Sequence, residues 1–197
     1  MNSSKNIQNA LHVLYKTYEN VQKLMDYTKV VAQEKTDYKI SSNKFLRYKS
    51  DNEPTAWLLN DFILLFQDNK DKECESKNGW KDAPVYVMEI YLGDEDYDED
   101  DLPAIYLSKF EYNDINEWYE GCSPADHWGF YWPLRSSEEM SFDSRENITI
   151  AIPKNEKASK TYWDLKKVTT KNLDLFEVTS ENLKEKVFGT FDELSKL

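Results

Sequence analysis

The chain has few of the residues and segments that are typical of several protein classes. Its 197 residues include only five Gly, six Pro and two Cys, and they contain no apolar run of 18 residues. The low glycine and proline content excludes collagen-like and linker-rich architectures, and two Cys do not make a disulfide framework. Residues 1–10 lack the basic-then-apolar pattern of a signal peptide. We therefore expect a cytoplasmic protein that does not enter a membrane.

Familiar catalytic motifs are missing as well. The sequence has no P-loop, dinucleotide-binding glycine pattern, nucleophile elbow or HExxH motif. Zinc sites usually draw four ligands from paired short motifs, so the neighbours Cys122, Asp126 and His127 are a weak zinc signal. Cys74 lies between two glutamates, which disfavour the reactive thiolate. We expect no metal and no cofactor, and a non-enzymatic protein is favoured.

What is present indicates a folded chain. Hydrophobic residues make up 40% and aromatic residues 14%, which suits one domain over residues 1–197 with a sizeable core. The apolar periodicities predict an α+β class: a mainly antiparallel sheet of about five to seven strands, packed on one face by long amphipathic N-terminal and C-terminal helices. The predicted parts are a helix over 1–35, a sheet-rich body over 36–178 and a helix over 179–197.

The N-terminal helix carries one continuous apolar stripe. Its members recur at spacings of four and three: Ile7, Leu11, Leu14, Tyr18, Val21 and Met25. The stripe predicts a helix that lies on the sheet. A heptad-like stripe of this length also suits a homodimer formed through the helix, which stays as an alternative.

Strands are predicted wherever apolar residues alternate or run together in β-rich composition. The predicted strands cover residues 36–49, 61–67, 85–92, 104–110, 147–152 and 161–168, with a strand or turn at 173–178. A short helical or irregular piece is expected at 55–59. Residues 153–160 are expected to form a solvated basic turn, and residues 85–110 an antiparallel hairpin.

The hairpin's loop, residues 93–102, is densely acidic. Seven of the eight positions from 94 to 101 are carboxylates, and they contribute to a formal net charge of -12 for the chain. Burying unpaired carboxylates costs several kcal/mol each, so the loop is expected to be solvated. It lacks the glycine and glutamate spacing of an EF-hand. Two interpretations stay open: a polar connection whose charge aids solubility, or a docking patch formed by Asp94, Glu95, Asp96, Asp98, Glu99, Asp100 and Asp101.

This charge favours a non-enzymatic interaction protein that binds a basic protein partner. Inhibitors, immunity proteins, anti-defence factors and nucleic-acid mimics present such surfaces. Residues 51–146 carry 25 Asp and Glu against seven Lys and Arg, which repels phosphate and anionic lipid, so neither direct nucleic-acid binding nor membrane binding is expected. The composition, rich in Lys, Asn, Tyr and Asp, is typical of a low-GC bacterial or phage chain.

A first alternative rests on the aromatic loop over residues 118–132. Six side chains in this loop suit a pocket for a base, a sugar or a peptide: Trp118, Tyr119, His127, Trp128, Tyr131 and Trp132. The protein would then be a small-ligand-binding module or a hydrolase. The competing interpretation is that the loop packs over the core, because buried aromatic residues contribute most stabilisation by area.

A second alternative is a magnesium-dependent nuclease. Such enzymes use an acid followed by an acid-x-Lys motif on a neighbouring strand to hold the metal and activate water. Asp143, Asp164 and Lys166 fit that pattern. The signal is weak, because the composition produces acid-x-Lys about as often by chance as it occurs here.

Overall fold

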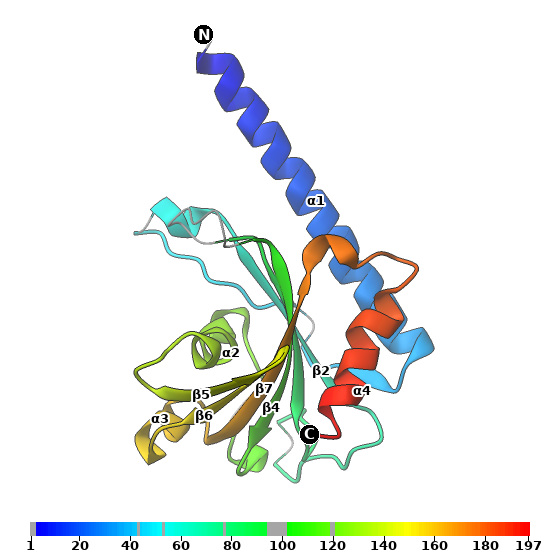
Figure 1. The fold of residues 1–197 in the computed structure, drawn as a ribbon, viewed down its shortest axis with the longest axis vertical. Coiled ribbons are helices and arrows are strands. Elements are labelled where there is room, and N and C mark those ends of the chain that lie inside the picture. The colour runs from blue at the N-terminus through cyan, green and yellow to red at the C-terminus, as the bar shows by residue number, and fades with distance from the viewer. Residues whose placement is uncertain (1–2, 43, 53, 77, 94–101, 119–120) are drawn as a thin grey trace.

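The computed structural model describes residues 3–42, 44–52, 54–76, 78–93, 102–118 and 121–197. A seven-stranded antiparallel sheet forms its centre, in the order β1-β2-β3-β4-β7-β6-β5. The strands are β1 (Tyr38–Ile40), β2 (Asp61–Asp68), β3 (Val85–Tyr91), β4 (Ala104–Tyr112), β5 (Met140–Arg145), β6 (Ile148–Pro153) and β7 (Leu165–Asp174). Figure 1 shows the sheet nearly edge-on, with helical layers on both sides.

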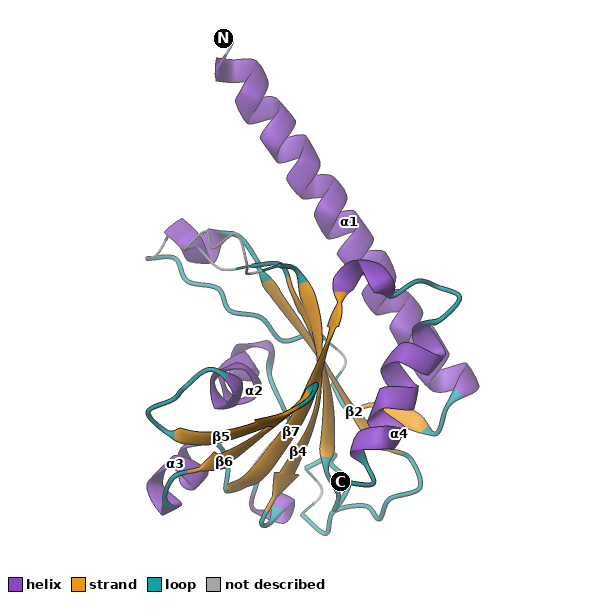
Figure 2. Ribbon diagram, viewed as in Figure 1, coloured by secondary structure: helices purple, strands orange, loops and turns teal. Residues whose placement is uncertain are grey.

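Helices occupy both ends of the chain and the connections between strands. The α-helices are α1 (Ser3–Lys35), α2 (Trp128–Tyr131), α3 (Glu156–Thr161) and α4 (Thr190–Leu194). Five short 3-10 turns are η1 (Pro54–Trp57), η2 (Ile115–Glu117), η3 (Pro124–His127), η4 (Trp132–Leu134) and η5 (Leu175–Glu177), and η6 (Lys184–Gly189) is a π-helix. Figure 2 shows α1 and α4 on one side of the sheet and α2 and α3 on the other.

The first face of the sheet is covered by the two ends of the chain. Alternate residues of β2, β3 and β4, such as Phe62, Met88 and Leu107, pack against the second half of α1 and against Phe188 and Phe191 of the C-terminal segment. The predicted packing of both terminal segments on one face is therefore confirmed. This burial removes large apolar groups from water, which is the main favourable term in folding.

The opposite face holds a second core. The intervening residues of the same strands, such as Ile63, Val87 and Phe110, pack beneath Trp118 and Phe130. All seven residues of β3 are consequently buried. A strand that is covered on both faces needs apolar side chains on both, so its sequence is a nearly continuous apolar run. This explains the composition of residues 85–91.

Most predicted elements match the structure. The long N-terminal helix, the antiparallel pairing of β3 with β4 and the predicted strands at 61–67 and 147–152 are present, with β2 and β6 extending one residue further. The helical piece near 55–59 is present as η1.

Three parts of the prediction were wrong: one strand was too long, one turn contains a helix, and one strand was missed. The predicted strand over 36–49 is limited to β1, and beyond it only the Ser41 amide, which donates to the Leu65 carbonyl, and Leu46, which bridges Ile63, still pair with β2. The predicted solvated turn at 153–160 contains α3, capped by the Asn155 side chain. The edge strand β5 was missed, because five of its six residues are exposed and carry no apolar alternation.

The strand predicted over 161–168 begins later. Trp163 and Asp164 both have positive φ angles, 57° and 63°. Non-glycine residues rarely adopt this left-handed conformation and cannot continue a strand in it. β7 therefore begins at Leu165 and absorbs the first part of the segment predicted at 173–178.

The predicted long C-terminal helix over 179–197 is also wrong in extent. The segment forms the six-residue π-helix η6 followed by the five-residue α4. The wider π turn still directs Val187, Phe188, Phe191 and Leu194 to the buried side. The apolar pattern thus identified the buried side but not the hydrogen-bonding of the backbone.

The N-terminal helix projects from the rest of the fold. Val21, Met25 and Val31 are buried on the sheet, whereas Ile7 and Leu11 in the first half are exposed. Figure 1 shows this half extending away from the other elements, with the N-terminus at its far end. Among the described residues, no helix has both the length and the apolar character needed to cross a membrane.

The close packing at Gly129 predicts that a larger residue there destabilises the protein. An added Cβ at Gly129 would overlap the Trp163 ring, so Gly129→Ala is expected to cost roughly 1–3 kcal/mol of unfolding free energy. Gly189, also in a helical segment, has open space around its Cβ position, and Gly189→Ala should stabilise by up to about 1 kcal/mol. Urea denaturation of both variants tests this, and equal effects would contradict the packing.

Candidate ligand-binding cleft

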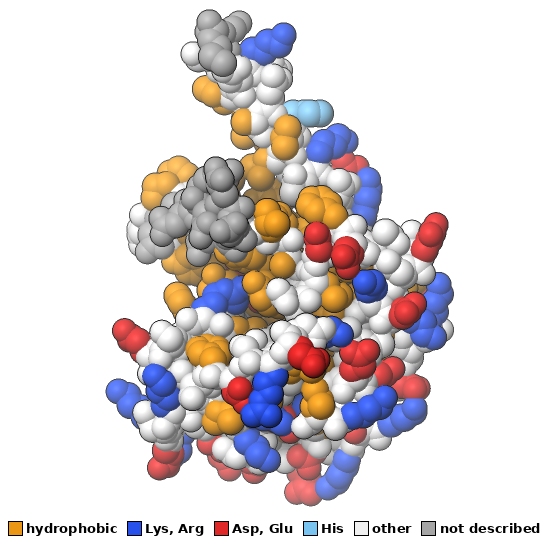
Figure 3. Space-filling view, in the orientation of Figure 1, with side chains coloured by type: hydrophobic (Ala, Val, Ile, Leu, Met, Phe, Trp, Pro, Cys, Tyr) orange, Lys and Arg blue, Asp and Glu red, His pale blue; other side chains and the backbone are white. Residues whose placement is uncertain are grey.

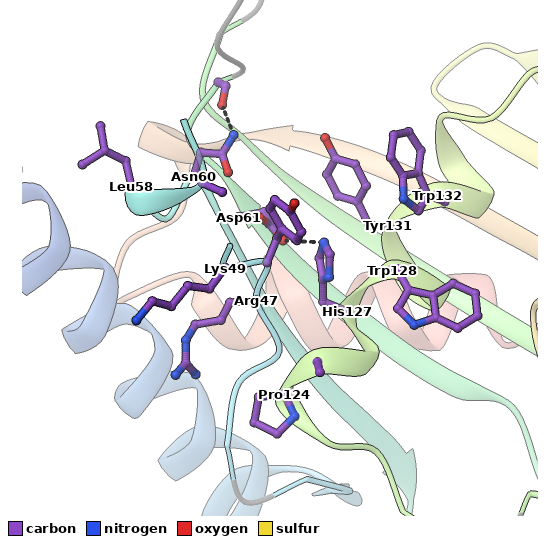
Figure 4. Close-up of a pocket in the computed structure, with 14 residues that line it drawn as sticks. Arg47, Lys49, Leu58, Asn60, Asp61, Pro124, His127, Trp128, Tyr131 and Trp132 are labelled. Atoms are coloured by element: carbon purple, nitrogen blue, oxygen red, sulfur yellow. Dashed lines mark hydrogen bonds and ion pairs between the residues drawn. The ribbon is translucent and has the colours of Figure 1, made fainter. Parts of the chain in front are cut away.

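A cleft opens on the second face of the sheet, at the end where β2 begins. One wall comes from the irregular segment 47–49 and from residues 56–61, and the other from η3, α2 and the start of η4. The walls meet at one end, where the Arg47 amide donates to the Pro124 carbonyl at 3.1 Å. Figure 4 shows Arg47, Lys49, Leu58 and Asn60 across the cleft from Trp128, Tyr131 and Trp132.

The cleft has a volume of about 1130 Å³. This is slightly above the usual range for ligand pockets, about 300–1,000 Å³, which are mostly apolar with a few convergent polar groups. In the view of Figure 3, hydrophobic side chains gather in the upper middle of the molecule, whereas acidic and basic side chains are mixed below them.

Asp61 and His127 form the polar floor. Both side chains are buried, and the Asp61 Oδ2 lies 3.9 Å from the His127 Nε2, a distance that suits electrostatic contact rather than a hydrogen bond. Burial lowers the pKa of His127 to about 4, and the positive charge of Arg135 adds to the drop. His127 is therefore neutral at pH 7 and presents both a donor and an acceptor nitrogen.

A buried ion pair supports this floor from behind. Glu89 on β3 is 1% exposed and lies on the same face as Asp61. Arg135, just after η4, binds it with both terminal guanidinium nitrogens, with Nη2–Oε1 at 2.7 Å and Nη1–Oε2 at 3.3 Å. Burial raises the pKa of Glu89 to about 7, while Arg135 acts in the opposite direction. Two-point contact of this kind fixes geometry as well as charge.

Aromatic rings hold the guanidinium in place and continue into the cleft. The Arg135 Cζ lies 3.7 Å from the Tyr131 ring centroid, 5.2 Å from that of Tyr91 and 5.3 Å from that of Tyr106, distances typical of cation–π contacts. The Tyr131 ring contacts His127, which in turn contacts Tyr48 on the opposite wall. A continuous row of planar groups thus crosses the cleft.

Some residues of the aromatic loop that was predicted as a ligand site pack in the core, and others line the cleft. Trp118 is 7% exposed and packs under Trp163, whose carbonyl accepts its indole N–H at 3.2 Å. His127, Trp128, Tyr131 and Trp132 line the cleft, while Tyr119 lies outside the described residues. Both interpretations of the loop therefore apply, each to different members.

The predicted docking patch of Asp94, Glu95, Asp96, Asp98, Glu99, Asp100 and Asp101 lies outside the described residues. The described residues contain 24 Lys and Arg against 28 Asp and Glu, a net charge of -4 out of the total of -12. Described carboxylates are often paired with lysines, as in Glu111–Lys167 at 2.8 Å and Glu193–Lys171 at 3.0 Å. An excess of negative charge is thus concentrated outside the described part.

The other candidate groups are not brought together in a reactive arrangement. Burial and Asp126 raise the pKa of the Cys122 thiol, and burial with Asp82, Asp114 and Glu73 raises that of Cys74. Neither thiol is activated as a nucleophile. Among the described residues, no group of three or more His, Cys, Asp or Glu is placed to hold a metal ion.

The nuclease residues are also separated. Asp143 pairs with Ile150, which pairs with Thr169 in β7. Asp164 precedes Thr169 by five residues, roughly 16 Å along an extended strand. Asp143 instead binds Arg145 at 2.9 Å.

Several residues of the cleft and of its support were missed from the sequence. The cleft residues Arg47, Tyr48 and Asp61 were not candidates, nor were Glu89 and Arg135 behind the floor. A usable signal existed for two of them, because Asp61 and Glu89 are single carboxylates within otherwise apolar runs. A lone acid in a buried strand needs a partner. Arg135 gave no comparable signal, since its partner lies 46 residues away.

Comparisons with known proteins add no assignment. No protein-family model matches the chain, and neither a curated protein nor a solved structure matches it. Any functional conclusion therefore depends on the geometry of the molecule.

The lowered pKa of His127 predicts a pH-dependent stability. The folded state binds a proton on His127 only near pH 4, whereas the unfolded state binds it near 6.5. The contribution of neutral His127 is thus complete above pH 6.5 and is lost as the pH falls towards 4. Wild-type protein should lose unfolding free energy relative to His127→Gln over this interval, as measured by urea denaturation.

Glu89 contributes with the opposite sign. Its raised pKa favours the folded state at low pH, and this contribution is lost as the pH rises from about 4.5 to 7. Because Glu89 is present in both proteins, its effect cancels in the difference between wild type and His127→Gln. Parallel pH profiles for the two would contradict the burial of a neutral His127.

Proposed function

We propose that the protein binds a small ligand in the cleft, and that the ligand is a mononucleotide or a compound with the same two features, a flat ring and an anionic group. The single observation that carries this proposal is the aromatic cleft of about 1130 Å³ with basic side chains at its rim and a buried carboxylate at its floor. We take the protein to act in the cytoplasm.

Aromatic side chains supply the recognition of a flat ring. Trp132 is 50% exposed although it is large and apolar, and Tyr48 on the other wall is 42% exposed. Stacking of a base on an aromatic side chain contributes about 1–3 kcal/mol. These exposed rings can accept a planar group without rearrangement of the core.

Arg47 and Lys49 supply the recognition of an anion. Within the described part of the chain, neither forms an ion pair, so each is available to a phosphate or carboxylate. Arg47 is held by its contact with the Phe45 ring, at 5.1 Å from the centroid. Both residues belong to the N-terminal 50 residues, where Lys and Arg outnumber Asp and Glu.

Asp61 supplies the polar contact at the floor. Its carboxylate oxygens accept hydrogen bonds, which suits a ligand that donates them, such as an exocyclic amino group. The described residues that line the cleft offer no Ser, Thr or Cys side chain beside His127. The arrangement therefore supports binding better than hydrolysis through a covalent intermediate.

Calorimetric titration with nucleoside monophosphates, the matching nucleosides, sugars and short peptides tests the proposal. A nucleotide should bind, and loss of its phosphate should weaken binding about tenfold. Trp132→Ala should weaken binding about tenfold as well, because it removes a stacking surface.

Trp57→Ala is the matched control. Trp57 is 64% exposed and does not line the cleft, so its loss should leave the affinity unchanged. Absence of nucleotide binding at millimolar concentration, or equal effects of the two Trp→Ala changes, would overturn the proposal. Binding of a sugar or peptide alone would assign the cleft to that ligand class instead.

A second function is favoured by the charge distribution. We propose that residues 94–101 dock a basic protein, as an inhibitor, immunity protein, anti-defence factor or nucleic-acid mimic would do. The supporting observation is that these eight positions hold seven carboxylates, whereas the described residues carry only -4. Concentrated charge steers and selects an oppositely charged partner.

This second proposal predicts salt-sensitive capture. Proteins retained by the immobilised wild type at about 50 mM salt should be released at about 500 mM, because the Debye length shortens several-fold. A variant with the seven carboxylates replaced by Asn and Gln should not retain them. Retention that survives both high salt and neutralisation would rule out this docking role.

A further inference from the structure

The first half of α1 exposes an apolar stripe that the fold leaves uncovered. Ile7 is 64% and Leu11 46% exposed, and Leu14 is half-buried. Tyr18, the next member, contacts Phe62 and donates its hydroxyl to the Leu59 carbonyl at 2.9 Å. The helix therefore meets the rest of the fold at Tyr18, and residues 3–17 lie beyond that point.

An uncovered helix of this length needs packing to be stable. Fifteen residues span about 22 Å, and an isolated helix of that size is marginal in water. Its apolar side chains stabilise it only when another surface removes them from water.

We propose that residues 3–17 of two copies of this chain pack against each other as an antiparallel pair. The 4-3 spacing of Ile7, Leu11, Leu14 and Tyr18 is that of the core positions of a two-stranded coiled coil. In an antiparallel pair, Leu11 of each copy lies opposite Leu14 of the other, and Ile7 reaches the end of the seam, where the other copy's helix meets its own fold at Tyr18.

The residues that flank this seam carry no charges that would repel a second copy. They are Gln8, Ala10, Tyr15 and Thr17, all of them uncharged. Charged residues at flanking positions usually set partner choice, and like charges there would repel. The nearest charged residues, Lys5, Lys16 and Glu19, lie away from the seam.

Charge selects the antiparallel orientation. Residues 1–18 contain two Lys and no Asp or Glu, so the remaining residues carry -14. A parallel pair would bring two strongly acidic parts together. An antiparallel pair separates the two net-negative parts along the length of the paired helices.

The seam is short, so the pair is expected to be of moderate strength. A contact about 22 Å long buries less surface than the standard stable interface. Association in the micromolar range follows from that limited area.

Sedimentation equilibrium of the full chain between about 5 and 500 µM tests the proposal. Wild type should approach twice its monomer mass of 23.3 kDa. Leu11→Glu should raise the dissociation constant at least tenfold, because it places a charge in the seam. Small-angle scattering should show two separated lobes, as the antiparallel orientation requires.

Val13→Glu is the matched control. Val13 is 64% exposed and lies on the side of the helix away from the seam, so this change should leave the dissociation constant unchanged. A wild type that stays monomeric over the whole range, or equal effects of the two substitutions, would overturn the proposal. A single compact scattering envelope would overturn the antiparallel orientation.

Discussion

The ion pair between Glu89 and Arg135 is the interaction on which the cleft depends. It links the centre of the sheet to the chain segment just after η4, and it is held by two nitrogen–oxygen contacts. Removing one member of such a buried pair typically costs about 3–5 kcal/mol, because the other charge is left uncompensated. The tyrosines around the guanidinium extend this constraint to Tyr131 and so to the wall of the cleft. The position of the helical layer therefore follows from one charge in the middle of β3.

Burying this ion pair in the core carries a desolvation cost that apolar side chains do not have. An apolar pair of similar volume would often be as stable or more stable. The same part of the molecule also contains a buried Asp61 and a His127 whose pKa is about 4. Clusters of buried ionisable groups with shifted pKa values beside a cleft are more common at functional sites than elsewhere. The electrostatics thus support the cleft, rather than the packed end of the aromatic loop, as the place where a ligand binds.

The two faces of the sheet have different roles. The first face is covered by the ends of the chain, and its polar contacts are ion pairs such as Glu111–Lys167 at the margin of the core. The second face combines a core beneath Phe130 with the cleft, where the irregular segment 47–49 stands apart from the helical layer. The uncovered half of α1 lies beyond both faces. Ligand binding and pairing of two copies would accordingly use separate surfaces.

The sequence by itself determined the α+β class, the long N-terminal helix and the strands at the centre of the sheet, because periodicity and apolar runs are local properties that burial preserves. Elements with weak local signals were missed, as the exposed β5 and the positive φ angles before β7 illustrate. Four of the six aromatic candidates line the cleft, since rings clustered in sequence tend to stay together in space. Only the tertiary structure decided which of them pack in the core, and only it brought Arg47, Asp61, Glu89 and Arg135 to one place. Contacts between residues dozens of positions apart depend on strand order and register, and those are set by the packing of the whole chain rather than by any one segment.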